Sequence, residues 1–566
     1  MQYNGARILL ECLKEQGVDT IFGYPGGTIL NVYDEMYKLG DTFRHILTSH
    51  EQGACHAADG YARATGKVGV CFATSGPGAT NLVTGIATAY LDSSPVVAIT
   101  CNVSTGLIGK DSFQEVDITG VTMPITKCNY LVRSVDHLAD TVREAFAIAR
   151  SGRPGPVLID IAKDVTAQTA EYEPLSRRDH GTNGRLRSLM ERYDFKPPEP
   201  DMEDIRLLAD MIRTSEKPFI ICGGGVVRSR AHEAMRTFVH RVDAPAAITV
   251  MGAGALSGSD PLVTGMIGMH GSQASNIAVD ECDLLIAVGC RFSDRVALKT
   301  DTFAQHAKIV QIDIDRSEIN KNVETDHHII GDARRILELL LPMLDQLDHT
   351  AWKKVVFSHP TETKYDERPG CLTPGDVLSA ITRLAPSESI ISTDVGQHQM
   401  WAIQHFHFDY PGQLLTSGGF GTMGFGLGAA IGAKAAFPDR TVIHVTGDGS
   451  FRMNCNELST ESYYGLPVIT ILFDNGTLGM VRQWQTLIYG GRFSQTTLDR
   501  APDFVKLAEA YGLNGFRVST LEDFQEAFSK ALNSDRGSVI DCRIDIDEKV
   551  RPMVGGGSHI TDFMLN

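Results

Sequence analysis

Short apolar runs alternate with amphipathic stretches along almost the whole chain. Runs typical of buried strands occupy 67–74, 95–100, 156–162, 218–222, 283–289, 308–315, 441–447 and 467–475. Stretches with the apolar spacing of a helix lie between them, for example 138–150. Short apolar strands alternating with helices are typical of parallel sheets covered on both faces. The pattern therefore predicts an α/β protein built from doubly wound parallel sheets.

Two polar, charged segments with clustered prolines, 168–202 and 346–374, interrupt this rhythm and are interpreted as linkers. At 566 residues the chain is long enough for three or four domains. We expect domains at 1–170, 198–345 and 372–550, followed by a C-terminal lid segment at 551–566.

The first and third domains share a local pattern. In the first, an apolar strand leads into "SGPGATN", and Pro95 opens the next strand 19 residues after Gly76. In the third, a strand leads into "GDGSFRMN", and Pro467 follows Gly447 by 20 residues. The similar spacing indicates an internal duplication. Both turns then lie at the carboxyl ends of parallel strands, where open α/β sheets bind ligands.

Composition limits the class of partner. The apolar content of 43% and charged content of 21% are those of a globular protein. The net charge is −17 and no Lys/Arg-rich run occurs, which argues against nucleic-acid or membrane binding. Eleven cysteines include no C-x-x-C pair, and the N-terminus resembles no signal peptide, so we expect reduced thiols and a cytoplasmic location.

Only the third-domain turn carries an acid, in Gly447-Asp448-Gly449. Asn475 ends the next apolar run, 27 residues after Asp448. Neighbouring parallel strands end at one edge of a sheet, so these two side chains are expected to converge. Carboxylate and amide oxygens suit Mg²⁺, and glycines let a phosphate approach the backbone. A plain Gly-Asp-Gly turn is the alternative.

The combination of Gly-Asp-Gly with a following Asn resembles the cofactor-anchoring motif of thiamine-diphosphate-dependent enzymes. The resemblance implies thiamine diphosphate and Mg²⁺, with the backbone carbonyl of Thr477 as a third metal ligand. It assigns the pyrimidine of the cofactor to the first domain and its diphosphate to the third. The cofactor-binding residues it implies are Val395, Gly396, Gln397, His398, Gly421, Met423, Gly447, Gly449, Ser450 and Met480.

The segment "SHEQGACHAADGYARATG" is similar to the pyrimidine-binding segment of the same family. The resemblance implies that Glu51 bonds the aminopyrimidine ring and promotes loss of the thiazolium proton. In this family one cofactor touches two subunits. We therefore expect a homodimer or tetramer whose active sites lie at subunit interfaces, since Glu51 and Asp448 belong to different domains.

The stretch "GGFGTMGFGLGAAIG" fits the dinucleotide fingerprint at Gly419, Gly421 and Gly424. The residues before it make a poor strand, and the fingerprint alone is a weak signal. In the thiamine interpretation this stretch lies under the cofactor, and Met423 holds the cofactor in its bent shape. A core methionine is the alternative.

Longer stretches resemble the catalytic subunits of the acetohydroxyacid synthase (acetolactate synthase) family. They include "FGYPGG", "TSGPGATN", "RPGPVLIDIAKDV", "TDVGQHQMW" and "GMVRQWQ", and the resemblance covers nearly the whole chain. It implies decarboxylation of pyruvate and condensation of the resulting enamine with pyruvate or 2-ketobutyrate. The products, 2-acetolactate and 2-aceto-2-hydroxybutyrate, lead to valine, leucine and isoleucine. A separate regulatory small subunit is also implied.

The resemblance gives roles to further side chains. Gly27, Phe113 and Gln114 would line the reaction face, and Arg295 would meet the carboxylate of the second substrate. Lys163 and Met269 would wall the access channel, although Lys163 and Arg295 could instead form surface ion pairs. "GMVRQWQ" is expected to form a short helix that presents Met480, Val481 and Trp484 on one face. Trp484 would contact the side chain of the incoming keto acid. The alternative is that Trp484 belongs to the core or to a lid.

The middle domain resembles the FAD site of the biosynthetic enzymes, with glycine turns that suit a pyrophosphate. The implied FAD-binding residues are Gly224, Gly225, Thr249, Val250, Met251, His270, Gly289, Arg291, Asp313 and Ile314. Rival interpretations are a catabolic acetolactate synthase without FAD, a glyoxylate carboligase, a 2-keto acid decarboxylase and a non-enzymatic thiamine-binding protein. Trp484 and Lys163 disfavour the first, and Glu51 disfavours a glyoxylate carboligase. The presence of Glu51, Asp448 and Asn475 disfavours the non-enzymatic protein.

Overall fold

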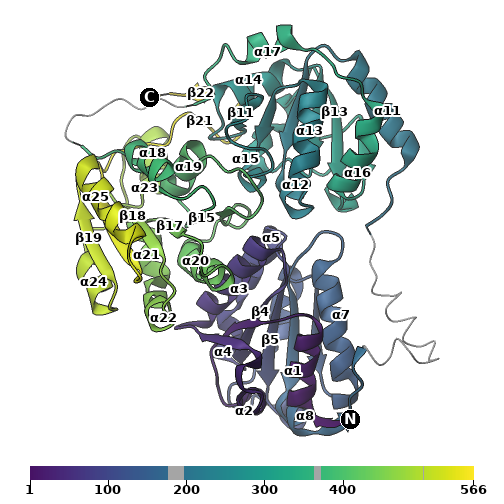
Figure 1. The fold of residues 1–566 in the computed structure, drawn as a ribbon, viewed down its shortest axis with the longest axis vertical. Coiled ribbons are helices and arrows are strands. Elements are labelled where there is room, and N and C mark those ends of the chain that lie inside the picture. Colours follow the sequence, from purple (N-terminus) through teal and green to yellow (C-terminus); the bar gives the residue numbers. More distant parts are fainter. Residues whose placement is uncertain (176–196, 363–370, 501, 566) are drawn as a thin grey trace.

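The computed structural model describes residues 1–175, 197–362, 371–500 and 502–565. Three six-stranded parallel sheets, each flanked by helices, form three lobes (Figure 1). The predicted doubly wound α/β fold is confirmed. Parts of both predicted linkers, 176–196 and 363–370, and the last residue of the predicted lid lie outside the described residues; the domain boundaries stay predictions.

The first sheet has the order β3-β2-β4-β5-β7-β6. Its strands are β2 (Thr20–Gly23), β3 (Arg44–Leu47), β4 (Gly69–Thr74), β5 (Val96–Asn102), β6 (Cys128–Val132) and β7 (Val157–Ala162). Its helices are α1 (Gly5–Glu15), α2 (Leu30–Lys38), α3 (Glu51–Thr65), α4 (Pro77–Asn81), α5 (Val83–Leu91), α6 (Ile118–Thr122), α7 (Leu138–Arg150) and α8 (Lys163–Ala167). The predicted helix at 138–150 is α7, whose buried Leu138, Val142, Phe146 and Ala149 share one face.

The third sheet repeats this topology with the order β16-β15-β17-β18-β20-β19. Its strands are β15 (Ile390–Thr393), β16 (Leu414–Leu415), β17 (Val442–Gly447), β18 (Ile469–Asp474), β19 (Asn514–Val518) and β20 (Ser538–Arg543). Its helices are α18 (Pro374–Leu384), α19 (Gln397–His405), α20 (Phe425–Ala436), α21 (Asp448–Asn454), α22 (Leu458–Tyr463), α23 (Gly479–Leu487), α24 (Phe504–Ala510) and α25 (Leu521–Leu532). Counted along the chain, both sheets have the order 2-1-3-4-6-5, which confirms the predicted duplication.

The middle sheet has a different order, β11-β10-β9-β12-β13-β14. Its strands are β9 (Pro218–Cys222), β10 (Ala246–Ile248), β11 (Val263–Met266), β12 (Leu284–Val288), β13 (Lys308–Asp313) and β14 (His327–Ile330). Its helices are α11 (Met202–Thr214), α12 (Gly224–Arg228), α13 (His232–Val242), α14 (Gln273–Glu281), α15 (Asp294–Ala297) and α16 (Ala333–Leu340). Counted along the chain the order is 3-2-1-4-5-6, that of dinucleotide-binding domains.

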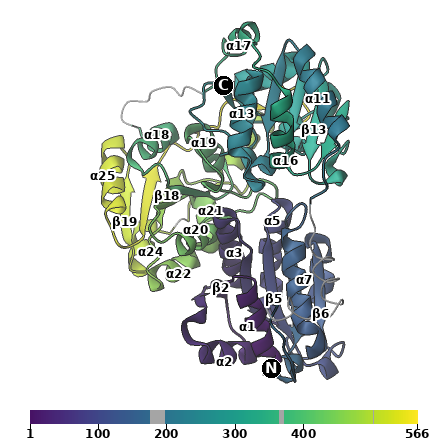
Figure 2. The ribbon, with the colours of Figure 1, turned by 45° about the vertical axis from the view of Figure 1, so that its right-hand side comes forward.

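Helices α3 and α20 join the first and third domains and lie side by side (Figure 2). They occupy equivalent places, because each links the second and third strands of its sheet. Glycines allow the close approach: a Cβ at Gly60 would overlap the carbonyl oxygen of Ala429, and one at Gly432 would overlap that of Ala57. The two duplicated domains therefore contact each other through matching helices.

Both predicted linkers contain regular structure. Residues 169–171 form β8 (Thr169–Glu171), which pairs antiparallel with β1 (Gln2–Asn4). Residues 350–356 form α17 (Thr350–Val356), and the buried Trp352 donates a hydrogen bond from Nε1 to the carbonyl of Pro218 (3.0 Å). Trp352 and the buried Val356 thus anchor a short helix within a largely polar segment. None of the helices in the described ranges combines the length and apolarity needed to cross a bilayer.

Candidate functional site

A pocket opens at the carboxyl ends of β15, β17 and β18, where the sequence predicts the diphosphate and metal. Its volume is about 90 Å³. The structure brings together there nearly all of the predicted thiamine and metal residues. Those lining it are Val395, Gly396, Gln397, His398, Met423, Gly447, Asp448, Gly449, Ser450, Asn475, Thr477 and Met480, and the predicted substrate residue Val481 also lines it. Gly421 lies outside this lining, and an added Cβ there would be 3.9 Å from Cγ1 of Val395.

Asp448 is the first residue of α21, immediately after β17, and only 2% of it is exposed. Its Oδ1 accepts a hydrogen bond from the N–H of Gly449 (2.9 Å), while its Oδ2 has no hydrogen-bond partner among the described residues. Burial, and then the neighbouring Asp474 carboxylate, raise the pKa of Asp448 to about 7. A buried carboxylate is costly unless it is paired or binds a cation. The orphaned oxygen therefore fits a metal ligand.

The other predicted metal ligands follow β18 in a tight turn. Oδ1 of Asn475 accepts a hydrogen bond from the N–H of Thr477 (3.2 Å), and Gly476 takes a φ of 66° between them. The Thr477 hydroxyl donates to the carbonyl of Thr496 (2.8 Å), which fixes the far side of the turn. A carboxylate, an amide and a backbone carbonyl form an oxygen donor set that suits Mg²⁺.

Glycines shape the remaining wall of this pocket. A Cβ at Gly447 would lie 2.9 Å from Nδ1 of His398, and one at Gly479 would overlap Oε1 of Gln397. Burial lowers the pKa of His398 to about 4, so its ring is neutral at pH 7. Because the glycines leave this wall without side chains, its backbone N–H groups can approach a bound phosphate.

Glu51 lies in the first domain, on α3, and does not line this pocket. Glu51 is the first residue of this helix, which is capped by the side chain of His50. The Glu51 side chain is buried, and its Oε2 accepts a hydrogen bond from Nδ2 of Asn81 (2.9 Å). A Cβ at Gly78 would lie 3.1 Å from its other oxygen, so the carboxylate borders the turn after β4.

The predicted Gln114, whose φ is 60°, lies in the loop between β5 and α6 and packs against the same turn. A Cβ at Gly76 would lie 2.8 Å from the carbonyl oxygen of Gln114. Gly27 is exposed, and its neighbour Gly26 packs against Thr74 at the end of β4. Glu51, Gly27 and Gln114 therefore collect at the edge of the first sheet that corresponds to the Asp448 edge of the third.

Most of the predicted substrate residues lie on exposed surface. The Phe113 side chain is 88% exposed, and Lys163 is exposed at the start of α8. Arg295 is exposed and lies 3.5 Å from the Asp294 carboxylate, the surface pair considered as the alternative. Val481 lines the thiamine pocket from α23, the predicted short helix, on which Trp484 is half-buried.

Met269 is buried and held by the C-terminal segment. Its N–H donates to the carbonyl of Arg295 (2.9 Å), and its carbonyl accepts from the N–H of Val554 (2.8 Å). Val554 belongs to β21 (Met553–Val554), which pairs with β22 (Phe563–Met564). The predicted lid thus runs from the third domain onto the middle domain.

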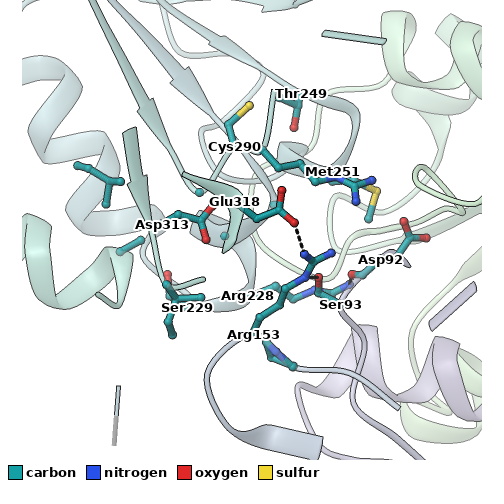
Figure 3. A pocket seen from close by; sticks show the side chains of 18 of the residues that line it. Asp92, Ser93, Arg153, Arg228, Ser229, Thr249, Met251, Cys290, Asp313 and Glu318 are labelled. Atoms are coloured by element: carbon teal, nitrogen blue, oxygen red, sulfur yellow. Dashed lines mark hydrogen bonds and ion pairs between the residues drawn. The ribbon is translucent and has the colours of Figure 1, made fainter. Parts of the chain in front are cut away.

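A larger pocket, of about 370 Å³, lies at the carboxyl ends of β9, β12 and β13 (Figure 3). It contains nine of the residues predicted for FAD, and Arg295 also lines it. The nine are Gly224, Gly225, Thr249, Val250, Met251, Gly289, Arg291, Asp313 and Ile314. His270 does not line it, and burial lowers the pKa of this histidine to about 4.

The chemistry of this pocket fits a dinucleotide. A Cβ at Gly225 would lie 2.6 Å from Cα of Gly289, so two glycine turns meet where a pyrophosphate would lie. Arg228 and Arg291 supply positive charge, and Asp313 at the end of β13 supplies a carboxylate for a ribose hydroxyl. Burial raises the pKa of Asp313 to about 6.

Several lining residues were missed by sequence reasoning because they come from another domain. Asp92, Ser93 and Arg153 reach the pocket from the first domain. Arg153 forms an ion pair of 2.6 Å with Glu318 across this boundary (Figure 3). No local signal marks such residues. Arg228 stands in "GGGVVRSR", four residues after Gly224, and its place beside a glycine turn could have drawn attention to it.

Comparison with known proteins agrees with this geometry. Residues 3–121 match the family described as "Thiamine pyrophosphate enzyme, N-terminal TPP binding domain", 205–340 its central domain and 394–542 its C-terminal TPP binding domain. The chain therefore belongs to the thiamine pyrophosphate enzymes.

Relatives that match along nearly the full length show which group of thiamine enzymes the chain belongs to. The chain is 44% identical to the "Acetolactate synthase isozyme 2 large subunit" of Escherichia coli (strain K12), covering 99% of both chains. It is 45% identical to the "Acetolactate synthase" of Arthrospira platensis, covering 99% of this chain and 97% of the relative. The "Acetolactate synthase large subunit" of Haemophilus influenzae is 40% identical over 100% of this chain and 98% of its own. Within the thiamine enzymes, the chain belongs to the acetolactate synthase large-subunit family.

Proposed function

We propose that this chain decarboxylates pyruvate and joins the two-carbon product to a second pyruvate or to 2-ketobutyrate. The products are 2-acetolactate and 2-aceto-2-hydroxybutyrate. The observation that carries the proposal is the buried Oδ2 of Asp448, which has no hydrogen-bond partner within the ranges that the structure describes and lies with Asn475 and Thr477 in a glycine-walled pocket. These three residues would hold Mg²⁺, and Mg²⁺ would hold the diphosphate of the cofactor.

Thiamine diphosphate, when bound, supplies a nucleophilic carbon that stabilises the negative charge left by loss of CO₂. Glu51 would hold a proton at N1′ of the aminopyrimidine, and this bond assists removal of the proton from the reacting carbon. Met423 would support the bent cofactor from below. Ser450 and Gln397 would orient the diphosphate from the pocket wall.

The site is complete only when Glu51 and Asp448 meet, and in one chain Glu51 does not line the Asp448 pocket. We therefore infer a homodimer, or a tetramer of such dimers, in which each chain contributes Glu51 to its neighbour. Large apolar side chains are exposed on both candidate surfaces. Tyr24, Leu30 and Phe113 are exposed on the first domain, and Met453, Val481, Ile488 and Tyr489 on the third.

Substrate contacts would come from residues around the mouth of the thiamine pocket. Gly27, Phe113 and Gln114 would close the reaction face from the first domain of the neighbouring subunit. Arg295 would bind the carboxylate of the second keto acid with its planar guanidinium. Lys163 and Met269 would line the approach, and Trp484 would contact the substrate side chain.

The dinucleotide pocket would hold FAD in a structural role, because the net reaction transfers no electrons. Arg228 and Arg291 would face its pyrophosphate, and His270 lies outside this lining. The names of the relatives mention a large subunit, and a separate small regulatory subunit is part of the proposal. All eleven cysteines are free thiols, which favours a reducing compartment such as the cytoplasm.

The test combines a spectrum with a product assay. Purified protein should show bound flavin absorbance and should form acetolactate from pyruvate when thiamine diphosphate and Mg²⁺ are present. Asp448→Asn should remove thiamine-diphosphate and Mg²⁺ binding and leave the flavin spectrum unchanged. Acetolactate formation without flavin would favour the catabolic alternative, and acetaldehyde as the main product would indicate a decarboxylase.

A further inference from the structure

The loop 416–424, which joins β16 to α20, borders both pockets. Gly418 lines the dinucleotide pocket, and a Cβ there would overlap Sδ of Met251. A Cβ at Gly419 would lie 3.0 Å from a guanidinium nitrogen of Arg291. Met423 lines the thiamine pocket at the other end of the loop. One short segment therefore contributes to the walls of two sites.

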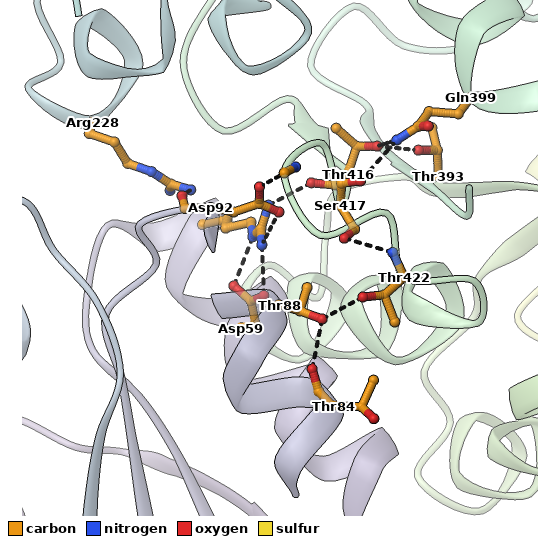
Figure 4. Close-up of polar contacts among 12 residues, drawn as sticks. Asp59, Thr84, Thr88, Asp92, Arg228, Thr393, Gln399, Thr416, Ser417 and Thr422 are labelled. Atoms are coloured by element: carbon orange, nitrogen blue, oxygen red, sulfur yellow. Dashed lines mark hydrogen bonds and ion pairs between the residues drawn. The ribbon is translucent and has the colours of Figure 1, made fainter. Parts of the chain in front are cut away.

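A buried cluster of charged residues holds this loop from the first domain (Figure 4). Arg63 on α3 forms ion pairs with Asp59 (2.7 Å) and Asp92 (3.1 Å), and the side chains of all three are at most 3% exposed. Nη1 of Arg63 donates to the carbonyl of Thr416 (2.6 Å), where the loop begins. The guanidinium also lies 4.9 Å from the ring centre of Phe425, where α20 begins.

Two further bonds hold the middle of the loop. Oδ1 of Asp92 accepts from the N–H of Gly419 (2.6 Å), and the hydroxyls of Thr88 and Thr422 are 2.6 Å apart (Figure 4). Arg228 of the middle domain donates from Nη2 to the carbonyl of Asp92 (2.9 Å). The loop is thus attached at both ends and in the middle, and the same cluster reaches the dinucleotide pocket through Arg228.

Such a cluster is poorly explained by stability alone. Replacing a buried ion pair with apolar side chains of similar volume is often neutral or stabilising. The planar guanidinium of Arg63, in contrast, can bond two carboxylates and a carbonyl in directions that an apolar side chain cannot define. The guanidinium of Arg63 therefore acts by geometry, because its bonds fix where the loop backbone lies.

We propose that Arg63, with Asp92 and Thr88, is a positioning residue that holds loop 416–424 in the shape both pockets need, and so couples the binding of FAD to that of thiamine diphosphate. This inference rests on the proposed function, which assigns these ligands to the pockets. Because the cluster holds the loop as one unit, a ligand that favours its bound position at one end also favours that position at the other end. By linkage, each ligand must then raise the affinity for the other by the same factor.

The test measures thiamine-diphosphate affinity, with Mg²⁺ present, in FAD-free and FAD-saturated protein. In the unaltered chain FAD should tighten binding at least about fivefold, the lower end of typical coupling. Thr88→Val keeps the shape of the side chain and removes the bond to Thr422, so the ratio should fall towards one. Thr122→Val is the matched control, because Thr122 is a fully buried threonine that bonds only within its own domain.

Arg63→Lys should lower the affinity ratio further. Arg143→Lys should leave it unchanged, because Arg143 is a buried arginine that pairs with Glu15 within the first domain. The inference is overturned if the ratio is one in the unaltered chain, or if Thr88→Val retains the full ratio. Thr88→Val decides the question even where Arg63→Lys does not fold. Failure of the unaltered chain to bind either cofactor would instead refute the proposed function.

Discussion

Oδ2 of Asp448 is buried without a hydrogen-bond partner in the described part of the chain, and Glu51 is bonded to Asn81 within another domain. In the proposed function these two carboxylates have different roles. Asp448 would bind the cation, and Glu51, which is buried in the first domain, would meet the cofactor bound by a second chain. Each can therefore be removed with a distinct expected result.

Glu51→Gln should leave thiamine diphosphate bound and slow carboligation by about 10²–10⁴-fold, the usual effect of losing a proton-transfer group. Calorimetry would measure cofactor affinity, and steady-state rates would measure turnover. Asn81→Ala provides a comparison, because it removes the bond to Glu51 and retains the carboxylate. Turnover of Glu51→Gln close to that of the unaltered chain would exclude Glu51 from the proton transfer.

Trp484→Leu should reduce the preference for 2-ketobutyrate and largely spare condensation of two pyruvates. The two acids differ by one methylene, which a hydrophobic pocket discriminates by about 1–3 kcal/mol at most. The ratio of the two products, formed in competition, measures the change. A lower total rate with an unchanged ratio would make Trp484 a structural residue of α23.

At the level of elements, the contact between α3 and α20 depends on residues without side chains. Gly432→Ala should lower the melting temperature, because the added Cβ overlaps the carbonyl oxygen of Ala57 and forces two helices apart. Overpacking of this kind costs about 1–3 kcal/mol. Gly106→Ala, whose new Cβ would have no neighbour within 4 Å, is the control. Equal melting temperatures for the two variants would contradict the close contact.

Elements were predictable where the pattern is periodic and continuous. The stretch at 138–150 matches α7, because its spacing defines one buried face. The run at 218–222 matches β9, because it is continuously apolar and every residue of the strand is buried. The helix α17 was missed, since its two buried residues, Trp352 and Val356, form too short a pattern within a polar segment. Both pack in a core cluster of the middle domain, and Trp352 donates to the carbonyl of Pro218; local sequence does not encode these contacts.

The residues of the two pockets also divide into those that the sequence could predict and those that it could not. Asp448, Asn475 and the glycines were predictable, because turns after parallel strands meet at one edge of a sheet. Arg153 and Asp92 were not, because they belong to the first domain and reach the dinucleotide pocket across a domain boundary. Arg63 is inside a quoted motif, and only the structure reveals that its guanidinium bonds a loop some 350 residues away.

For the whole molecule, mixing two inactive variants tests where the active sites lie. If each site takes Glu51 from one chain and Asp448 from the other, co-expressed Glu51→Gln and Asp448→Asn chains should recover about a quarter of full activity. Half of randomly assembled dimers are mixed, and each mixed dimer has one intact site. Each variant alone is the control. No recovery in mixed dimers would indicate that one chain builds a complete site.

The identical strand order of the first and third sheets has a consequence for symmetry. The proposed dimer would present four topologically equivalent sheet edges, two followed by Ser75-Gly76-Pro77-Gly78 and two by Gly447-Asp448-Gly449. Were all four alike, facing edges would present two acidic turns to one cofactor, or none. Because only the third-domain copy carries the acid, each facing pair would join a metal-binding edge to an edge without a metal. The difference between the two copies would thus halve the number of metal centres and give each one an orientation.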